Sequence, residues 1–328
     1  MNQLGFLAMI NPLRFSFWVM VRNPSEVVRA WTAPLLLGLA LVLGVGMAPS
    51  VQAQSSPVPE GATVEKVAGG FEFTEGPLWH DGRLVFSDIP ANTVYEWTPD
   101  EGASVFLKPS GHANGLAVSA EGRLLLAQHD GQVARLTTEG EIEPLVTSYQ
   151  GSRLNSPNDL TVADDGTIYF TDPPYGVDEK NRELDFAGVY RLDPDGTLTL
   201  LTTEFARPNG IVLSPDESTL YVNDTDGDLI RAYDVTENGD IANGRVFAEM
   251  TGEAPGNADG MKVDADGNLY STGPGGIWIY TPDGELLDRI SVPEGPTNLA
   301  FGGPGRQTLY ITAQSNVYRI PLRVSGAE

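Results

Sequence analysis

The chain has 328 residues, of which 44 are acidic and 20 are basic, giving a formal net charge of −24. This acidic balance argues against a nucleic-acid partner, whose phosphates are neutralised by Lys and Arg, and against an anionic membrane surface. The absence of Cys excludes disulfides, thiolate zinc sites and a Cys nucleophile, and three histidines are too few for us to expect a three-His zinc site.

The first 53 residues have the layout of a secretory signal peptide. Three Arg residues precede a 16-residue apolar run at 33–48, and Val51-Gln52-Ala53 forms a small-x-small cleavage site. We therefore expect export to the periplasm or the outside of the cell, cleavage after Ala53, and no stable membrane association afterwards. The run is short for a membrane span, but Phe17–Val21 adds apolar length, so an uncleaved N-terminal anchor is the alternative.

Beyond Ala53, short β-rich runs alternate with turns of Gly, Asp, Asn and Pro, and no helical periodicity is sustained. Six units each open with a polar residue just before an apolar strand. The opening residues, separated by 39, 44, 51, 50 and 39 positions, are Glu75, Asn114, Asn158, Asn209, Asp259 and Asn298. Six such units, each with room for four strands, predict an all-β fold, a six-bladed β-propeller with four-stranded blades.

The last unit ends near Val324 and has room for only three strands. Thr63–Val67 lies before the first opening residue, so we expect this N-terminal strand to complete the last blade and close the ring. The expected organisation is a short linker at 54–62, the propeller at 63–324 and a C-terminal tail at 325–328. A β-sandwich or two small β domains would also suit this strand spacing, but neither explains a polar residue at one phase of every repeat.

The six opening residues should form one ring, because the innermost strands of a propeller line its central channel. All six side chains carry oxygen and none is basic, which suits a hard cation such as Ca²⁺. In a single blade, Asn or Asp could simply begin a strand through its own backbone hydrogen bonds. The recurrence in all six units favours a metal. No nucleophile elbow, P-loop or zinc-protease motif competes with metal-assisted chemistry.

Six strings, in blade order, resemble the senescence marker protein/gluconolactonase family, which includes regucalcin, and most closely its bacterial gluconolactonase branch. They are TEGPLW, NSPNDL, FTDPPYG, RPNGIVLSP, ADGMKVDADGNLY and TNLAFGG. The resemblance implies one divalent ion, most often Ca²⁺ with Mg²⁺, Mn²⁺ or Zn²⁺ as alternatives, held by Glu75, Asn158, Asn209 and Asp259. It also implies that Asp259 is the catalytic general base.

Substrate contacts are expected from six further residues around the implied ion: Asn114, His112, His129, Asp172, Tyr175 and Asn298. The two histidines match pocket positions of the family, and ordering of the inner loops is their alternative role. Asp172 could equally fix the turn before Pro173-Pro174. Regucalcin-like members carry Arg where this chain has Ser156, so their substrate preference does not transfer.

These features together predict a hydrolase that opens a sugar lactone such as glucono-1,5-lactone. The metal would polarise the lactone carbonyl, and Asp259 would activate the attacking water. One alternative is hydrolysis of another lactone, an ester or a phosphotriester. The other is a non-catalytic secreted propeller that binds a sugar acid or a protein, with a purely structural ion. Protein partners stay unknown from the sequence.

Overall fold

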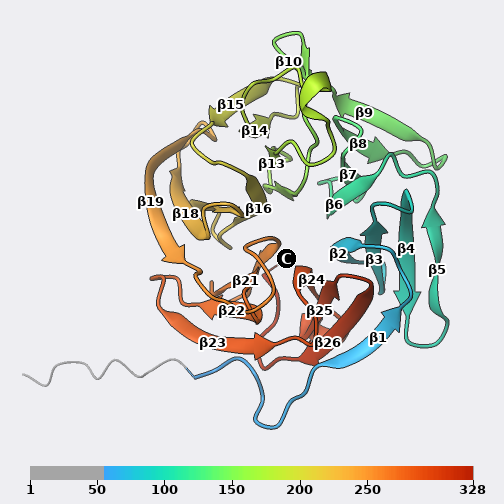
Figure 1. Ribbon diagram of the computed structural model, residues 1–328, viewed down its shortest axis with the longest axis vertical. Helices are drawn as coiled ribbons and strands as arrows, with labels where there is room; N and C mark the ends of the chain where they lie inside the picture. Colours follow the sequence, from blue (N-terminus) through green and yellow to red (C-terminus); the bar gives the residue numbers. More distant parts are fainter. Residues whose placement is uncertain (1–54, 328) are drawn as a thin grey trace, which may run out of the picture. The chain divides into compact units, whose positions relative to one another are not determined.

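The computed structural model describes residues 55–327, whose strands form six four-stranded antiparallel sheets arranged as blades around a central axis (Figure 1). The predicted all-β six-bladed propeller is therefore confirmed. The expected signal peptide, with its anchor alternative, lies outside the described residues. Within residues 55–327, no helix is long and apolar enough to cross a bilayer.

Each blade begins at the channel and ends at the rim. Blade 1 comprises β2 (Thr74–His80), β3 (Arg83–Asp88), β4 (Thr93–Thr98) and β5 (Gly102–Leu107). Blade 2 comprises β6 (Ala113–Val118), β7 (Leu124–Gln128), β8 (Gln132–Leu136) and β9 (Ile142–Val146). Blade 3 comprises β12 (Leu160–Val162), β13 (Ile168–Asp172), β14 (Gly188–Leu192) and β15 (Leu198–Thr202). Blade 4 comprises β16 (Pro208–Leu213), β17 (Thr219–Asp224), β18 (Leu229–Val235) and β19 (Ile241–Glu249). Blade 5 comprises β20 (Met261–Val263), β21 (Leu269–Gly273), β22 (Gly276–Tyr280) and β23 (Leu286–Ser291). Blade 6 comprises β24 (Pro296–Gly302), β25 (Thr308–Ala313) and β26 (Asn316–Pro321), and its outermost strand is β1 (Glu65–Gly69).

Tight turns join the strands within a blade. In blade 1, His80 pairs with Arg83, and the two residues between them, Asp81 and Gly82, have φ angles of 49° and 78°. Positive φ at both central positions is the geometry of a type I′ hairpin turn, which Asp-Gly sequences favour. In other Asp-Gly turns only the glycine has positive φ, as at Gly166, Gly196 and Gly267, so Gly supplies the left-handed position there.

The core lies between neighbouring blades. The second strand of each blade is buried along nearly its whole length because another blade covers each of its faces, and β7 (LLLAQ) and β13 (IYFTD) are buried throughout. Phe170 on β13 stacks on Tyr190 of β14 with ring centroids 5.2 Å apart. Burying one such side chain contributes about 2–3 kcal/mol. The apolar runs of the sequence are therefore the inter-blade layers.

The N-terminal strand closes the ring, as the sequence predicted. β1 pairs antiparallel with β26, with Glu65 opposite Arg319 and Gly69 opposite Asn316. The Arg319 guanidinium lies 2.9 Å from the Glu65 carboxylate across this pair. The strand spans 65–69, two residues later than expected, and completes a sheet that would otherwise have three strands.

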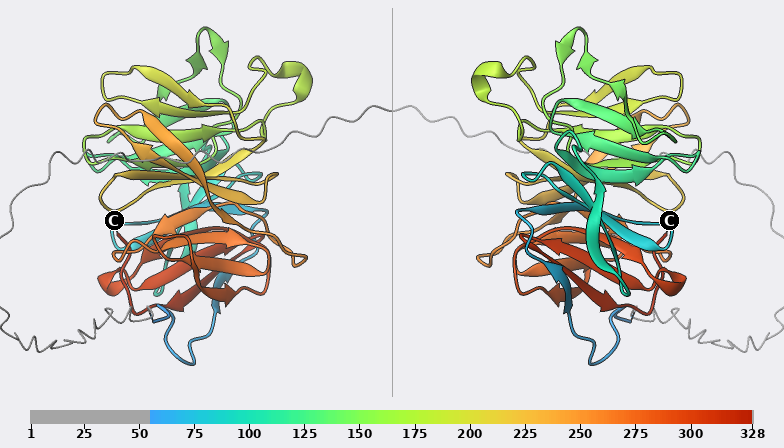
Figure 2. Two further views of the ribbon diagram at one scale, coloured as in Figure 1. Left: turned by 90° about the vertical axis from the view of Figure 1, so that its left-hand side faces the viewer. Right: turned by 90° about the vertical axis from the view of Figure 1, so that its right-hand side faces the viewer.

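Two segments outside the strands also rest on the propeller. The residues before β1 are held by a hydrogen bond from the Arg323 backbone N–H to Pro57 O (2.8 Å), and Val58 packs against the blade 6 cluster. At the other end, Ala265 N donates to Ser325 O (2.9 Å) and Gly326 forms an isolated bridge with Asp264. The β10–β11 hairpin (Ser148–Tyr149 and Ser152–Arg153) extends beyond the rim at blade 3 (Figures 1 and 2).

Candidate active site

A belt of hydrogen bonds between neighbouring blades fixes the channel ends of the inner strands. Three of its bonds are donated by backbone N–H groups: Gly115 to Asn158 O (2.7 Å), Gly210 to Asp259 O (3.0 Å) and Gly260 to Thr297 O (2.8 Å). The remaining three interfaces are bridged by hydroxyl donors: Ser87 to Asn114 O (2.8 Å), Thr171 to Asn209 O (2.7 Å) and Thr297 to Thr74 O (2.7 Å). Each blade thus holds its neighbour at or beside the opening residue.

Glycine follows four of the opening residues because blades approach closely there. A Cβ atom on Gly115 would lie 2.7 Å from the Asn158 carbonyl oxygen, and one on Gly76 or Gly210 would come closer still to the backbone of the next blade. Gly76 also has a φ of 48°, a conformation that disfavours other residues. The E-G, N-G and D-G strings therefore reflect blade contact.

The belt brings the six opening residues together around the axis. Five are nearly buried, with exposures of 3–4%, and Asp259 is partly exposed. Asn298 Nδ2 donates to Glu75 Oε2 (3.0 Å), and Gly76 N donates to the same oxygen (2.7 Å). No described residue donates a hydrogen bond to Glu75 Oε1 or engages the Asn158 side-chain amide. These oxygens are therefore available to a ligand in the channel.

The buried carboxylates at the axis have perturbed pKa values. Burial raises the pKa of Glu75 to about 7, against opposing hydrogen bonds, and the nearby charge of Asp159 adds to the rise. Burial also raises the pKa of Asp259 well above its usual range, reinforced by the charges of Glu75 and Asp159 and opposed by the Asn209 amide. Asp159 thus raises the pKa of both Glu75 and Asp259, and the charge of Lys262 opposes the rise at Glu75.

Asp159 is a site residue that the sequence analysis missed. It is 2% exposed and follows Asn158 directly, in the place that Gly occupies after four other opening residues. Its electrostatic influence on both Glu75 and Asp259 shows that its carboxylate lies near theirs. The signal was the departure of blade 3 from the repeat, N-D in place of N-G.

The donor set fits a divalent cation of the hard class. Among residues 55–327, no three acidic or histidine side chains are grouped closely enough to hold a metal ion by themselves, so a cation would also need amide oxygens. Asn209 supplies such an oxygen beside Asp259, and Asn158 is the amide at the same phase of blade 3. Carboxylate and amide oxygens without His or Cys are the ligands that Ca²⁺ prefers, and a cation would offset the mutual repulsion of the buried carboxylates.

Tyr175 and His129 form a wall of the channel mouth. Their rings stack with centroids 6.5 Å apart and planes 16° from parallel, and the Arg207 guanidinium lies 5.1 Å from the centre of the Tyr175 ring. Ser156 holds the loop that carries Tyr175, donating to Pro173 O and accepting from Gly176 N (2.9 Å). The uncharged residue at 156 thus has a structural contact in this chain.

His129 is neutral in this setting. Burial lowers its pKa to about 4, and the charge of His112 contributes further. Asn114 Nδ2 lies 3.2 Å from His129 Nε2, so Nε2 accepts from the amide and the ring proton is on Nδ1. His129 and Asn114 are therefore coupled groups on the channel side of blade 2.

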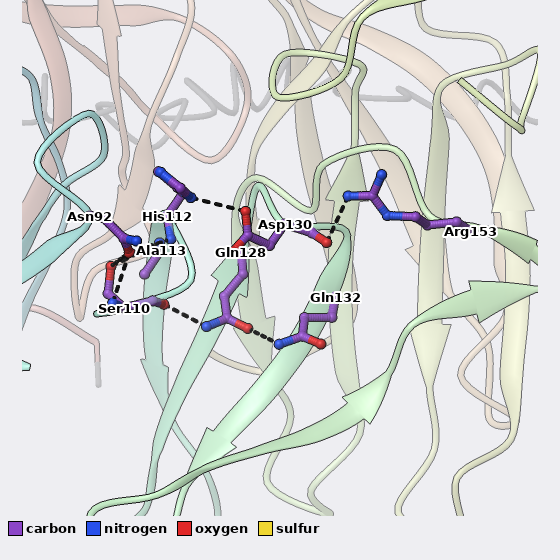
Figure 3. A network of polar contacts seen from close by, with 8 residues as sticks. All are labelled: Asn92, Ser110, His112, Ala113, Gln128, Asp130, Gln132 and Arg153. Atoms are coloured by element: carbon purple, nitrogen blue, oxygen red, sulfur yellow. Dashed lines mark hydrogen bonds and ion pairs between the residues drawn. The ribbon is translucent and has the colours of Figure 1, made fainter. Parts of the chain in front are cut away.

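His112 lies in a separate polar network at the start of blade 2 (Figure 3). Its Nδ1 is 2.9 Å from Asp130 Oδ1, and its side chain is 42% exposed. Asn92 Oδ1 accepts from the backbone N–H groups of Ser110 (2.8 Å) and His112 (2.9 Å), which fixes the loop (Figure 3). The geometry therefore gives His112 a loop-ordering contact.

Asp172 is fully buried behind the channel wall. Its Oδ2 accepts hydrogen bonds from Asn155 N (2.9 Å) and Asn155 Nδ2 (3.2 Å). Burial raises the pKa of Asp172 to about 7, despite these hydrogen bonds. Through Asn155, Asp172 supports the loop that presents Asn158 to the channel.

Comparisons with known proteins agree with this architecture. Residues 73–315 match the SMP-30/gluconolactonase/LRE-like region. The chain is 40% identical over 295 residues to a gluconolactonase of Zymomonas mobilis, covering 80% of this chain and 82% of that one. It is 30% identical over 245 residues to a pentonolactonase of Haloferax volcanii, covering 73% and 80%.

A solved gluconolactonase structure from Xanthomonas campestris superimposes with a TM-score of 0.75 at 36% identity, covering 81% of this chain and 91% of that one. The match spans all six blades from the start of blade 1 into blade 6. The resemblance inferred from the six sequence strings is thereby confirmed: the chain belongs to the SMP-30/gluconolactonase/LRE-like family.

Proposed function

We propose that this protein is a metal-dependent hydrolase of sugar lactones, with an aldonolactone such as glucono-1,5-lactone as substrate. The observation that carries the proposal is the channel centre, where the charge of buried Glu75 and the amide of Asn209 act on partly exposed Asp259, and buried Asn158 opens blade 3 at the same phase of the repeat. The names of the relatives, gluconolactonase and pentonolactonase, support the substrate class.

Glu75, Asn158, Asn209 and Asp259 would hold the divalent ion, for which Ca²⁺ is our first choice. When bound, the ion supplies a Lewis acid that polarises the lactone carbonyl oxygen. The fixed Oε2 contacts of Glu75 orient its carboxylate, since Gly76 and Asn298 both donate to that oxygen. Ordered ligands of this kind reduce the reorganisation needed when substrate binds.

Asp259 would act as the general base. It is the ring residue with partial exposure, and the mechanism places a water molecule at its carboxylate. The carboxylate takes one proton from that water as the water oxygen bonds to the lactone carbon. The bond from that carbon to the ring oxygen then breaks, and the proton passes to the departing oxygen, giving the open-chain hydroxy acid.

The polyol part of the substrate would contact the wall of the channel mouth. Asn114 and neutral His129 offer an amide and an imidazole for hydroxyl groups, and the Tyr175 ring stacks beside His129 in the same wall. Asn298 would act through Glu75, whose carboxylate it contacts. We assign Asp172 and His112 to loop support, in keeping with their hydrogen bonds.

The test is proton release from glucono-1,5-lactone by chelator-stripped protein, corrected for spontaneous opening, before and after addition of Ca²⁺, Mg²⁺, Mn²⁺ or Zn²⁺. We expect turnover that returns with metal and falls at least about 100-fold in Asp259→Asn. Asp266→Asn, an exposed turn position in the same blade, is the matched control and should keep wild-type activity. Equal rates for Asp259→Asn and wild type, both metal-loaded, would refute the mechanism.

Export remains part of the proposal. The apolar run at 33–48 and the site at Val51-Gln52-Ala53 predict a mature protein that begins at Gln54. N-terminal sequencing of protein from the periplasm or culture medium should read Gln54 first. Recovery of the intact N-terminus in a membrane fraction would instead support the anchor.

A further inference from the structure

Thr225 lies just after β17 and joins two side chains, from blades 3 and 4, to a backbone carbonyl that precedes blade 5. Its Oγ1 lies 3.0 Å from Asn209 Nδ2, 3.2 Å from Tyr175 Oη and 2.8 Å from Ala258 O. Asn209 Nδ2 is also 3.2 Å from Tyr175 Oη. Neither the repeat phase nor any of the six sequence strings pointed to Thr225.

The hydrogen-bond donors and acceptors in this cluster determine which way the Asn209 amide faces. A backbone carbonyl can only accept, so the single hydroxyl proton of Thr225 is committed to Ala258 O. Thr225 Oγ1 can then only accept from the other groups. The Asn209 side chain must therefore present its NH₂ group to Thr225, since its carbonyl oxygen would meet lone pairs there. Tyr175 accepts the second N–H of the same amide.

With Nδ2 facing Thr225 Oγ1 and Tyr175 Oη, Asn209 Oδ1 is the end of the amide that faces away from both groups. No residue in the described part of the chain donates a hydrogen bond to this oxygen. Asn209 also lowers the pKa of the Asp259 carboxylate through a side-chain hydrogen bond, in which the amide N–H is the donor, so the amide lies beside that group. An amide rotated by 180° would direct N–H groups at the position where a cation needs an oxygen.

We infer that Thr225 is a positioning residue, which fixes the Asn209 amide with its oxygen toward the divalent cation. This inference rests on the proposed metal site and adds a residue to it. Thr225 also connects two ligands, because Ala258 immediately precedes Asp259. The hydroxyl therefore adds one contact between blades 4 and 5 at the site as well as orienting the amide of one proposed ligand.

The experiment compares Ca²⁺ binding to chelator-stripped full-length protein by isothermal titration calorimetry. Thr225→Val keeps the side-chain shape but removes the acceptor, and we expect about 10–100-fold weaker Ca²⁺ binding, the usual effect of losing a group that orients a ligand. Thr225→Ser restores the hydroxyl and should bind within about threefold of wild type. Thr236→Val, an exposed position in the same blade, is the control.

A second pair of readouts separates positioning from folding. The melting temperature of metal-free Thr225→Val should stay within a few degrees of wild type, while that of the Ca²⁺-loaded form falls. If Thr225→Val does not fold, Tyr175→Phe removes the other acceptor of the Asn209 amide and should weaken Ca²⁺ binding about three- to tenfold. Wild-type Ca²⁺ affinity in a folded Thr225→Val, or in Tyr175→Phe where that variant is the test, would overturn the inference.

The result for lactone hydrolysis is independent of the result for Thr225. If wild type binds Ca²⁺ but opens no lactone, and Thr225→Val binds Ca²⁺ more weakly, the proposed function fails and the positioning role stands. If wild type hydrolyses lactones and the Thr225→Val and wild-type affinities are equal, the positioning role fails alone. If wild type binds no divalent cation, both fail.

Discussion

Asp172 makes the stability of the protein depend on pH in a defined direction. Its side chain is fully buried, and within the described residues no group donates to its Oδ1. Burial raises the pKa of this carboxyl from 3.8 to about 7. Replacing Asp172 by Asn keeps the shape and the oxygen that accepts from Asn155, and removes the titration.

Proton linkage at Asp172 sets the sign and the magnitude of the pH dependence of the unfolding free energy. Between pH 4 and pH 7 the folded protein keeps a proton on Asp172 that the unfolded chain has released, so the free energy of unfolding falls as pH rises. Each pH unit lowers it by about 1.4 kcal/mol, and the shift of the Asp172 pKa sets a total of about 4 kcal/mol. The stabilisation is fully present below pH 4 and is lost above pH 7.

The assay is urea unfolding of wild type and Asp172→Asn at matched pH values from 4 to 8, with the same Ca²⁺ concentration. The wild-type unfolding free energy, relative to that of the variant, should decline by about 4 kcal/mol across this range. Asp185→Asn, an exposed position in the loop between β13 and β14, should give a profile parallel to wild type. If the Asp172→Asn profile runs parallel to that of wild type, Asp172 is not the source of the pH dependence.

Three further predictions concern the blades, the metal and the channel wall. Gly210→Ala places a methyl group against Asp259 O and should lower the unfolding free energy by about 2–4 kcal/mol. In Gly295→Ala the nearest neighbour of the new methyl group is 3.6 Å away, so the unfolding free energy should change little. Equal urea midpoints for the two variants would contradict this. Chelation of Ca²⁺ from protein held at 100 times its dissociation constant should remove about 2.7 kcal/mol and lower the melting temperature, and an unchanged melting curve would count against the site. Because the pKa of His129 is about 4, any inflection of kcat/KM near pH 6.5 in wild type should also be present in His129→Gln. The His129→Gln variant should nevertheless lose about fivefold in kcat/KM, because one hydrogen bond is lost.

The repeat phase was enough to predict the blades and the ring. Each opening residue follows the same local rule, a polar side chain before a buried strand, and six copies of that rule place six side chains around one axis. The closing strand could be predicted because the last unit lacked one. Its bounds were two residues early, since the sequence does not show where pairing with β26 begins.

The groups around the ring were harder to predict because they depend on contacts between blades. Asp159 broke the repeat, but its nearness to Glu75 and Asp259 appears only when three blades are assembled. Thr225 lies 16 positions after Asn209 and meets it through the return of a neighbouring strand. Asp172 follows a buried strand, and its sequence alone does not say that its carboxyl faces Asn155.

The pairing of β1 with β26 also sets the order in which the molecule is completed. Glu65 and Arg319 are separated by 254 positions, so the first strand of the ring waits for nearly the whole chain to be synthesised. Until then β1 has a free edge, which can pair with other chains. The Glu75–Asn298 hydrogen bond spans the junction between blades 6 and 1, so the proposed cation site would be assembled only when the ring closes. A nascent or truncated chain would therefore lack this site, and cation binding would report that synthesis and closure are finished.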